Sequence, residues 1–166
     1  MFNETYGLET AVLNGTKTRT WREGEKPRYK VGEVVAIKMS YSKVCEYDMD
    51  FLIRHGYALE DGSIRTDVLY SAGWSNKMYV KNELMPFQIK IISVKKCRLR
   101  NLTDNDCIKE GVKKYKSCQA FFVPGINDSY HAEKNAFANL IVRITGQDDY
   151  WDRNPMGYAY EFELIK

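Results

Sequence analysis

Histidine is scarce in this sequence and cysteines are not paired, which argues against the commonest metal sites. The 166 residues include only two histidines, His55 and His131, far apart in the chain. The four cysteines form no C-x-x-C pair. Zinc sites gather these residue types at short, fixed spacings. We therefore expect no metal ion and no cofactor, and reduced, buried thiols.

Long apolar runs are missing as well. No segment approaches the roughly 20 apolar residues of a membrane span. The first ten residues, MFNETYGLET, lack the basic flank and apolar run of a signal peptide. No repeat or low-complexity tract is present. We expect a cytoplasmic protein with no membrane association, and nothing in the sequence identifies a protein partner.

Charge of either sign is not in large excess. The net charge is +3, too small to indicate a nucleic-acid binder by itself. Hydrophobic residues make up 44% and charged residues 28%, values typical of a globular chain of a size that buries one core. We expect a single domain over residues 1–166, with an insertion-like region at about 42–85.

Hydrophobic spacing predicts separated strands with helices between them. A first helix is expected to begin at Asn3 or Thr5 and to end at Gly15. Further helices are expected over about 45–55, 103–110 and 129–146, and strands over 16–22, 34–39, 87–99 and 158–165. This order argues against repeated βαβ units. It predicts an α+β fold, a small β-barrel of mixed or antiparallel strands with flanking helices.

The segment GTKTRTWR, residues 15–22, has the composition of a phosphate loop but the wrong order. A phosphate loop places its lysine directly after the last glycine, at the start of a helix. Here Thr16 intervenes, and a helix precedes a strand. We therefore exclude a phosphate loop.

Chemistry in this segment would depend on Thr20 as a nucleophile and Lys17 as its base. A lysine serves as a base when burial or a nearby cation, such as Arg19 or Arg22, lowers its pKa. In a regular strand Lys17 and Thr20 would face opposite sides. They converge only if Lys17 lies in the loop after Gly15 or if a bulge intervenes.

A second unusual residue is Glu110. Thr103-Asp104-Asn105-Asp106 resembles a capping box, and the short helix that it starts ends before Gly111. A carboxylate in the last turn of a helix meets the negative end of the helix dipole, at a cost of about 0.3–1 kcal/mol. A buried cation such as Lys17 would compensate for it. The pair would be either an acid/base unit or a structural salt bridge.

Two basic segments and several aromatic residues are candidates for nucleic-acid contacts. The basic segments would form one patch if the fold brings them together; otherwise they are solvated faces. The aromatic residues would either stack on a base or pack in the core. The basic residues are Lys95, Lys96, Arg98, Arg100, Lys113 and Lys114, and the aromatic residues are Trp21, Trp74, Tyr150 and Trp151.

Several of these motifs together resemble the ASCH domain family, whose members share the PUA-like barrel. VLNGTKTRTWR followed by YKVGEVVAI is similar to the opening of the family. The resemblance continues through NKMYVKNELMPFQIKIISVKKCRLRNLTDNDCIKEGV and WDRNPMGYAYEFELI, as in ASCH proteins of phage and bacterial genomes. It covers nearly the whole chain and is weakest over 42–73.

The resemblance implies binding of RNA, or of a modified nucleoside or nucleotide, in a polar pocket near Lys17, Thr20, Arg22 and Glu110. Gly15, Thr18, Trp21 and Trp151 are further ligand-binding candidates.

One small branch of the family hydrolyses N4-acetylcytidine. Its lysine, threonine and glutamate fall on Lys17, Thr20 and Glu110, and its arginine on Arg22. Thr20 would then attack the amide carbonyl, Lys17 would take its proton, and Glu110 would position the lysine or protonate the leaving amine. This is the alternative, metal-independent amidohydrolase function. A ribonuclease and a phage interaction protein are further alternatives.

Overall fold

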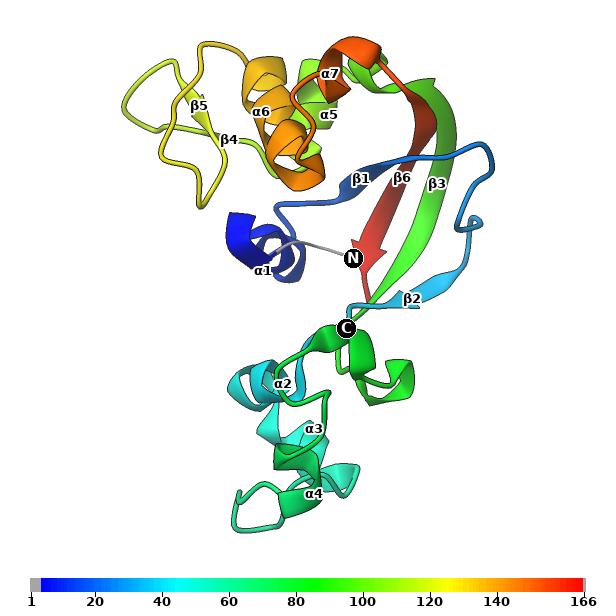
Figure 1. Ribbon diagram of the computed structural model, residues 1–166, viewed down its shortest axis with the longest axis vertical. Helices are drawn as coiled ribbons and strands as arrows, with labels where there is room; N and C mark the ends of the chain where they lie inside the picture. Colours follow the sequence, from blue (N-terminus) through cyan, green and yellow to red (C-terminus); the bar gives the residue numbers. More distant parts are fainter. Residues whose placement is uncertain (1–3, 166) are drawn as a thin grey trace. The chain divides into compact units, whose positions relative to one another are not determined.

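The computed structural model describes residues 4–165, which form two compact units (Figure 1). The larger unit comprises residues 4–33 and 90–164, and the smaller comprises residues 34–89 and 165. Helices are combined with a curled antiparallel sheet, which confirms the predicted α+β class. The segment 42–85, expected to be insertion-like, lies in the smaller unit.

The main sheet has the strand order β1-β6-β3-β2. Strand β1 (Arg19–Glu23) runs antiparallel to β6 (Met156–Leu164) and places Thr20 opposite Tyr160. Strands β3 (Gln88–Arg98) and β2 (Val34–Ala36) also lie in segments expected to be strands.

Strand β1 begins three residues later than expected. The main-chain N–H of Lys17 donates to Ala11 O at 2.8 Å, and that of Thr18 donates to Lys109 O at 3.0 Å. Both donors are therefore committed to helices rather than to a neighbouring strand. Residues 16–18 form a loop as a result.

Strand β6 contributes two large residues to the core of the larger unit, as the alternation of large apolar residues with other residues along this strand predicts. Tyr160 and Phe162 are buried. Ala159 alternates with these residues and should face away from the core, but it is buried too. Leu164 should face the core, but it is exposed, so alternation alone does not determine burial at these two positions. Gly157 is required because a Cβ there would lie 2.5 Å from the Trp21 ring.

The helices of the larger unit gather beside β1 and β6 (Figure 1). Thr103 caps α5 through the predicted capping box with Asp106. Asn3, one predicted start of the first helix, lies outside the described residues, and Thr5, the other, lies in a separate 3-10 turn. The elements are η1 (Glu4–Tyr6), α1 (Leu8–Leu13), η4 (Leu99–Asn101), α5 (Asp104–Lys109), α6 (Glu133–Thr145) and α7 (Tyr150–Arg153).

A small two-stranded sheet completes the larger unit. Strand β4 (Lys113–Lys114) pairs with β5 (Phe121–Phe122). Tyr130 forms an antiparallel bridge with Phe121, which keeps its main chain extended. Helix α6 therefore begins at Glu133 rather than at 129.

The smaller unit is mainly helical. The prediction of one helix over 45–55 is wrong, because α2 (Tyr41–Tyr47) and α3 (Met49–Arg54) are separate helices with Asp48 between them as a cap. Asp48 is not helical, and its carboxylate accepts a hydrogen bond from Phe51 N–H at 3.0 Å, which caps α3. The remaining elements are α4 (Thr66–Leu69), η2 (Lys77–Tyr79) and η3 (Asn82–Leu84). Over residues 4–165, no helix combines the length and apolarity needed to cross a membrane.

Candidate functional site

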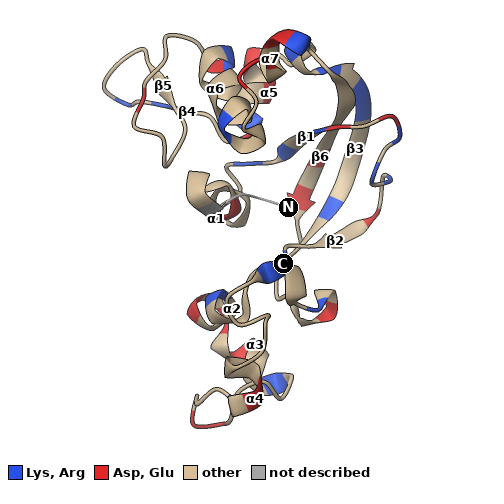
Figure 2. Ribbon diagram, in the orientation of Figure 1, with Lys and Arg blue, Asp and Glu red and all other residues tan. Residues whose placement is uncertain are grey.

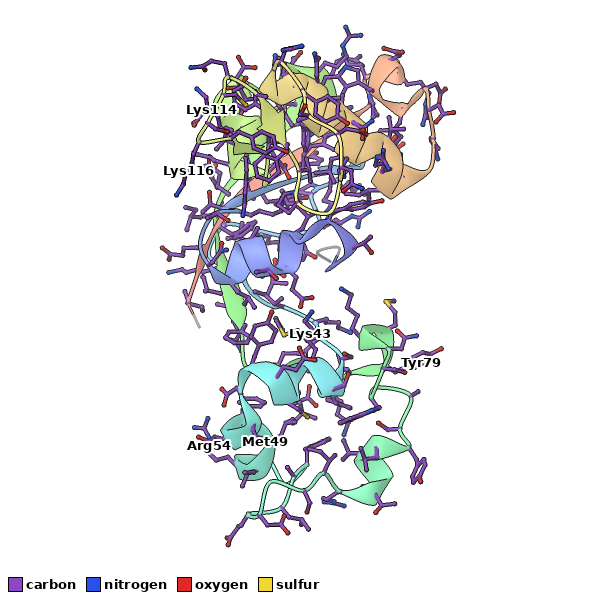
Figure 3. The ribbon with its side chains drawn as sticks, turned by 90° about the vertical axis from the view of Figure 1, so that its left-hand side faces the viewer. Lys43, Met49, Arg54, Tyr79, Lys114 and Lys116 are labelled. Atoms are coloured by element: carbon purple, nitrogen blue, oxygen red, sulfur yellow. The ribbon has the colours of Figure 1, made fainter. Side chains whose placement is uncertain are left out.

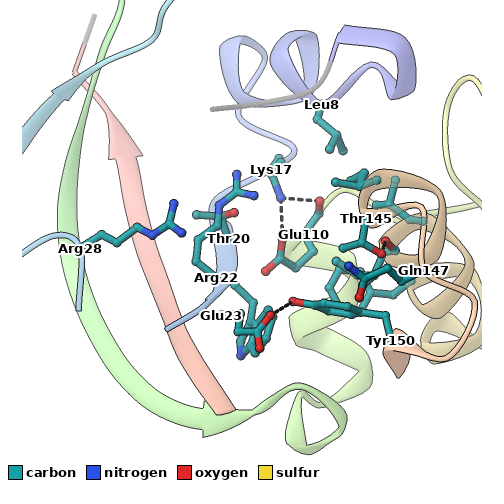
Figure 4. A pocket seen from close by; sticks show the side chains of 15 residues that line it. Leu8, Lys17, Thr20, Arg22, Glu23, Arg28, Glu110, Thr145, Gln147 and Tyr150 are labelled. Atoms are coloured by element: carbon teal, nitrogen blue, oxygen red, sulfur yellow. Dashed lines mark hydrogen bonds and ion pairs between the residues drawn. The ribbon is translucent and has the colours of Figure 1, made fainter. Parts of the chain in front are cut away.

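A pocket of about 530 Å³ lies within the larger unit (Figure 4). Strand β1 and the end of α5 supply polar side chains, and α6 supplies a largely apolar wall. The lining residues are Leu8, Lys17, Thr20, Trp21, Arg22, Glu23, Arg28, Glu110, Phe137, Leu140, Ile141, Ile144, Thr145, Gln147 and Tyr150.

Lys17 reaches this pocket because it lies in the loop between α1 and β1. Gly15, at φ +73°, turns the chain after the helix in a conformation that glycine adopts without strain. The loop frees Lys17 from strand alternation. Lys17 and Thr20 consequently line the same pocket, and no bulge is needed.

Lys17 and Glu110 form a buried ion pair. The Lys17 Nζ donates to Glu110 Oε2 at 2.7 Å and to the main-chain O of Glu110 at 2.6 Å. Their side chains are only 2% and 5% exposed. Glu110 is the C-terminal cap of α5, so the ammonium group offsets both the carboxylate and the negative end of the helix. The other carboxylate oxygen, Oε1, is buried without a hydrogen-bond partner among the described residues.

Burial lowers the pKa of Lys17 below its ordinary value of 10.5, because the charged amine loses its hydration. The charge and hydrogen bond of Glu110 act in the opposite direction but do not outweigh burial. The positive charge of Arg22 lowers the pKa further. The pocket therefore makes the neutral amine, the form that can accept a proton, easier to reach than it is for a lysine in water.

Thr20 presents its hydroxyl from the middle of β1. The residue is 7% exposed, and its hydroxyl makes no hydrogen bond with residues 4–165. It is thus available to a ligand or to a base.

Arg19, the other cation expected near Lys17, is engaged elsewhere. Its guanidinium pairs with Asp106 and, at 3.2 Å, with Glu161. The charge of Arg19 is not among the causes that shift the pKa of Lys17. Of the two arginines expected to lower this pKa, Arg22 is the one that does so.

Two pocket residues form a pair that sequence reasoning did not find. The Tyr150 hydroxyl donates to Glu23 Oε2 at 2.7 Å (Figure 4). Tyr150 was expected only as a stacking residue, and Glu23 was not expected at all. Arg28 and Gln147 also line the pocket and were missed, and no motif in the sequence marks them.

The remaining ligand-binding candidates have structural contacts. Trp21 lines the pocket, but its indole N–H donates to Cys97 O at 3.2 Å and its ring packs on Gly157. Trp151 packs edge-on against Phe137, with ring centroids 6.3 Å apart. Gly15, Thr18 and Trp151 are not part of the pocket lining, and Trp74 belongs to the smaller unit.

The two basic segments are not brought together. Figure 2 shows the end of β3 and strand β4 separated by α5 and α6. On β3, Lys96 lies 5.9 Å from the centre of the Tyr158 ring, and Arg98 donates a hydrogen bond to Asn154 O at 3.1 Å. On the other side, Lys114 and Lys116 project outward (Figure 3). Each segment is a separate exposed face.

Within residues 4–165, no three His, Cys, Asp or Glu side chains are grouped closely enough to hold an ion. Comparisons with protein-family models, curated protein sequences and solved structures found no match that would identify a family.

Proposed function

We propose that the protein binds a nucleoside or nucleotide in the pocket of its larger unit, as a PUA-like domain of the ASCH type. The observation that carries the proposal is the buried Lys17–Glu110 pair beside Thr20 and Arg22 in one pocket. These four residues are the positions to which the ASCH resemblance assigns the ligand site. The volume of about 530 Å³ suits a small molecule, since such sites typically occupy about 300–1,000 Å³.

The two walls of the pocket match the two halves of a nucleotide. Ile141 and Ile144 on α6 are half-buried and offer apolar surface against which a base can pack, with the buried Phe137 and Leu140 behind them. Arg22 and Arg28 offer guanidinium groups suited to ribose hydroxyls or phosphate oxygens.

Calorimetric titration with cytidine 5′-monophosphate tests the proposal. Arg22→Met should weaken binding about tenfold or more, because charge-assisted hydrogen bonds contribute about 1.5–3 kcal/mol. Arg143→Met is the matched control, since Arg143 lies outside the pocket and is paired with Asp128 at 3.0 Å. Equal affinity of both variants, or no binding by the wild type, would contradict the proposal.

A second candidate function is hydrolysis of an N4-acylated cytidine. Its support is the lowered pKa of Lys17 together with the unbonded hydroxyl of Thr20. The Thr20 oxygen would attack the amide carbonyl carbon while the neutral Lys17 amine takes the hydroxyl proton. The C–N bond would then break, the Lys17 ammonium would protonate the leaving amine, and water would hydrolyse the acyl-threonine ester.

Chromatography of N4-acetylcytidine after incubation with the protein tests this reaction. Thr20→Val should abolish cytidine release, because the nucleophilic oxygen is gone. Thr145→Val is a matched control, since Thr145 also lines the pocket but its hydroxyl is bonded to Ile141 O at 2.9 Å. Release by Thr20→Val at the wild-type rate would exclude Thr20 as nucleophile. No release by the folded wild type would exclude this substrate and leave the binding proposal standing.

A further inference from the structure

The Glu23–Tyr150 pair lies in the pocket but has no role in the proposed binding or hydrolysis. Tyr150 is the first residue of α7 and is 7% exposed. Its hydroxyl donates to Glu23 Oε2 at 2.7 Å, and the Arg153 guanidinium lies 5.1 Å from the centre of its ring. A buried tyrosine thus fixes a carboxylate from the end of β1.

The direction of this hydrogen bond is defined. Burial raises the pKa of Tyr150, and the bond to the Glu23 carboxylate raises it further, so the phenol keeps its proton. The hydroxyl is the donor and Glu23 the acceptor. Tyr150 therefore orients a carboxylate, which is an acceptor-only group, at the pocket wall.

One oxygen of this carboxylate remains available. Within residues 4–165, the Tyr150 hydroxyl is the hydrogen-bond partner of the Glu23 side chain, and neither Arg22 nor Arg28 forms an ion pair with it. Oε1 can accept a hydrogen bond from a ligand. A ligand that presents a carbonyl oxygen there would instead place two acceptors against each other.

We propose that Glu23, positioned by Tyr150, selects bases that carry an N–H donor at the position of the cytosine 4-amino group over bases with a carbonyl there. Cytosine and N4-acylcytosine both present such a donor, and uracil presents an acceptor. Carboxylate side chains pair with this cytosine amino group in nucleic-acid recognition. The inference rests on the proposed function, because it assigns the base end of the same ligand.

Parallel titrations with cytidine 5′-monophosphate and uridine 5′-monophosphate test the inference, since these ligands differ at the edge that Glu23 would contact. The wild type should prefer the cytidine nucleotide by about fivefold to tenfold, because Glu23, although exposed, accepts a charge-assisted hydrogen bond from the cytosine amino group and opposes the uracil carbonyl. Glu23→Gln should remove most of this preference, because an amide can turn its N–H toward a carbonyl. Tyr150→Phe should reduce it partly, since the carboxylate remains but is no longer oriented.

Glu25→Gln is the matched control, because Glu25 is two residues away, exposed and outside the pocket. It should keep the wild-type preference, and thermal unfolding should show that all variants are folded. Equal binding of the two nucleotides by the wild type, or an unchanged preference in Glu23→Gln, would overturn the role of Glu23 while leaving the nucleotide pocket intact. Binding of neither nucleotide would overturn both proposals.

Discussion

Replacement of Lys17 by methionine should destabilise the larger unit strongly, because it leaves Glu110 buried without its cation. The pair spans 2.7 Å, and its side chains are 2% and 5% exposed. Removing one partner of a buried ion pair typically costs about 3–5 kcal/mol. We expect about 3 kcal/mol, the lower end of that range, because the adjoining pocket can admit water to the carboxylate.

Urea unfolding followed by tryptophan fluorescence measures this cost. A Trp74→Phe background leaves Trp21 and Trp151, both in the larger unit, so the signal reports that unit. With a urea dependence of about 2 kcal/mol per M, the midpoint should fall by about 1.5 M. Glu110→Gln should also destabilise. The double variant should be less destabilised than the sum of the two by about 1–3 kcal/mol, since the groups are in direct contact.

The control is an exposed ion pair in the same unit. Arg143 and Asp128 lie 3.0 Å apart, but their side chains are 46% and 56% exposed. Arg143→Met should therefore change stability by no more than about 1 kcal/mol. If Lys17→Met costs no more than Arg143→Met, or if the two pair variants are additive, the reasoning about a buried, coupled pair is refuted.

Three further predictions concern the surroundings of the site. Thr103→Ala should lower the unfolding free energy by about 1 kcal/mol, since it removes the cap of α5, and an unchanged urea midpoint would contradict this. The lowered pKa of Lys17 means that, between that pKa and 10.5, the unfolded chain binds the proton and the folded chain does not. The difference in unfolding free energy between the wild type and Lys17→Met should therefore change in favour of the wild type as pH rises through that window, and this gain should be lost as pH falls. A difference that does not depend on pH would contradict the lowered pKa. Gly157→Ala should lower the unfolding free energy by about 1–3 kcal/mol, measured with urea, because the new Cβ would meet the Trp21 ring. Gly24→Ala should lower it less, because the nearest atom to its Cβ would lie at 3.4 Å. Equal effects of the two substitutions would contradict the close packing of Gly157 on Trp21.

Local signals in the sequence were enough to predict the elements that hold Thr20 and Glu110. The Thr103 capping box and Gly111 defined α5, so Glu110 was expected at its end. Alternation predicted β6, and the aromatic and β-branched residues predicted β1, although the predicted strand began three residues too early. Spacing within one segment determines each of these features.

The other half of the pocket depends on contacts between distant segments. Glu23 and Tyr150 meet only when α7 packs beside the end of β1, and α7 is too short for hydrophobic periodicity to reveal it. The start of α6 was misplaced because Tyr130 pairs with Phe121 across a loop. The meeting of Lys17 and Thr20 required a loop that main-chain bonds to Ala11 and Lys109 create.

Amide chemical-shift mapping locates the nucleotide on the protein and so tests whether it binds in the pocket of the larger unit. Cytidine 5′-monophosphate is titrated into the ¹⁵N-labelled full chain, and the shifted amides are assigned. If the nucleotide binds in the pocket, the shifted amides should cluster on residues 18–23, 110–111 and 144–150 around it. Shifts concentrated on the exposed basic segment 95–100, with the pocket amides unchanged, would contradict it.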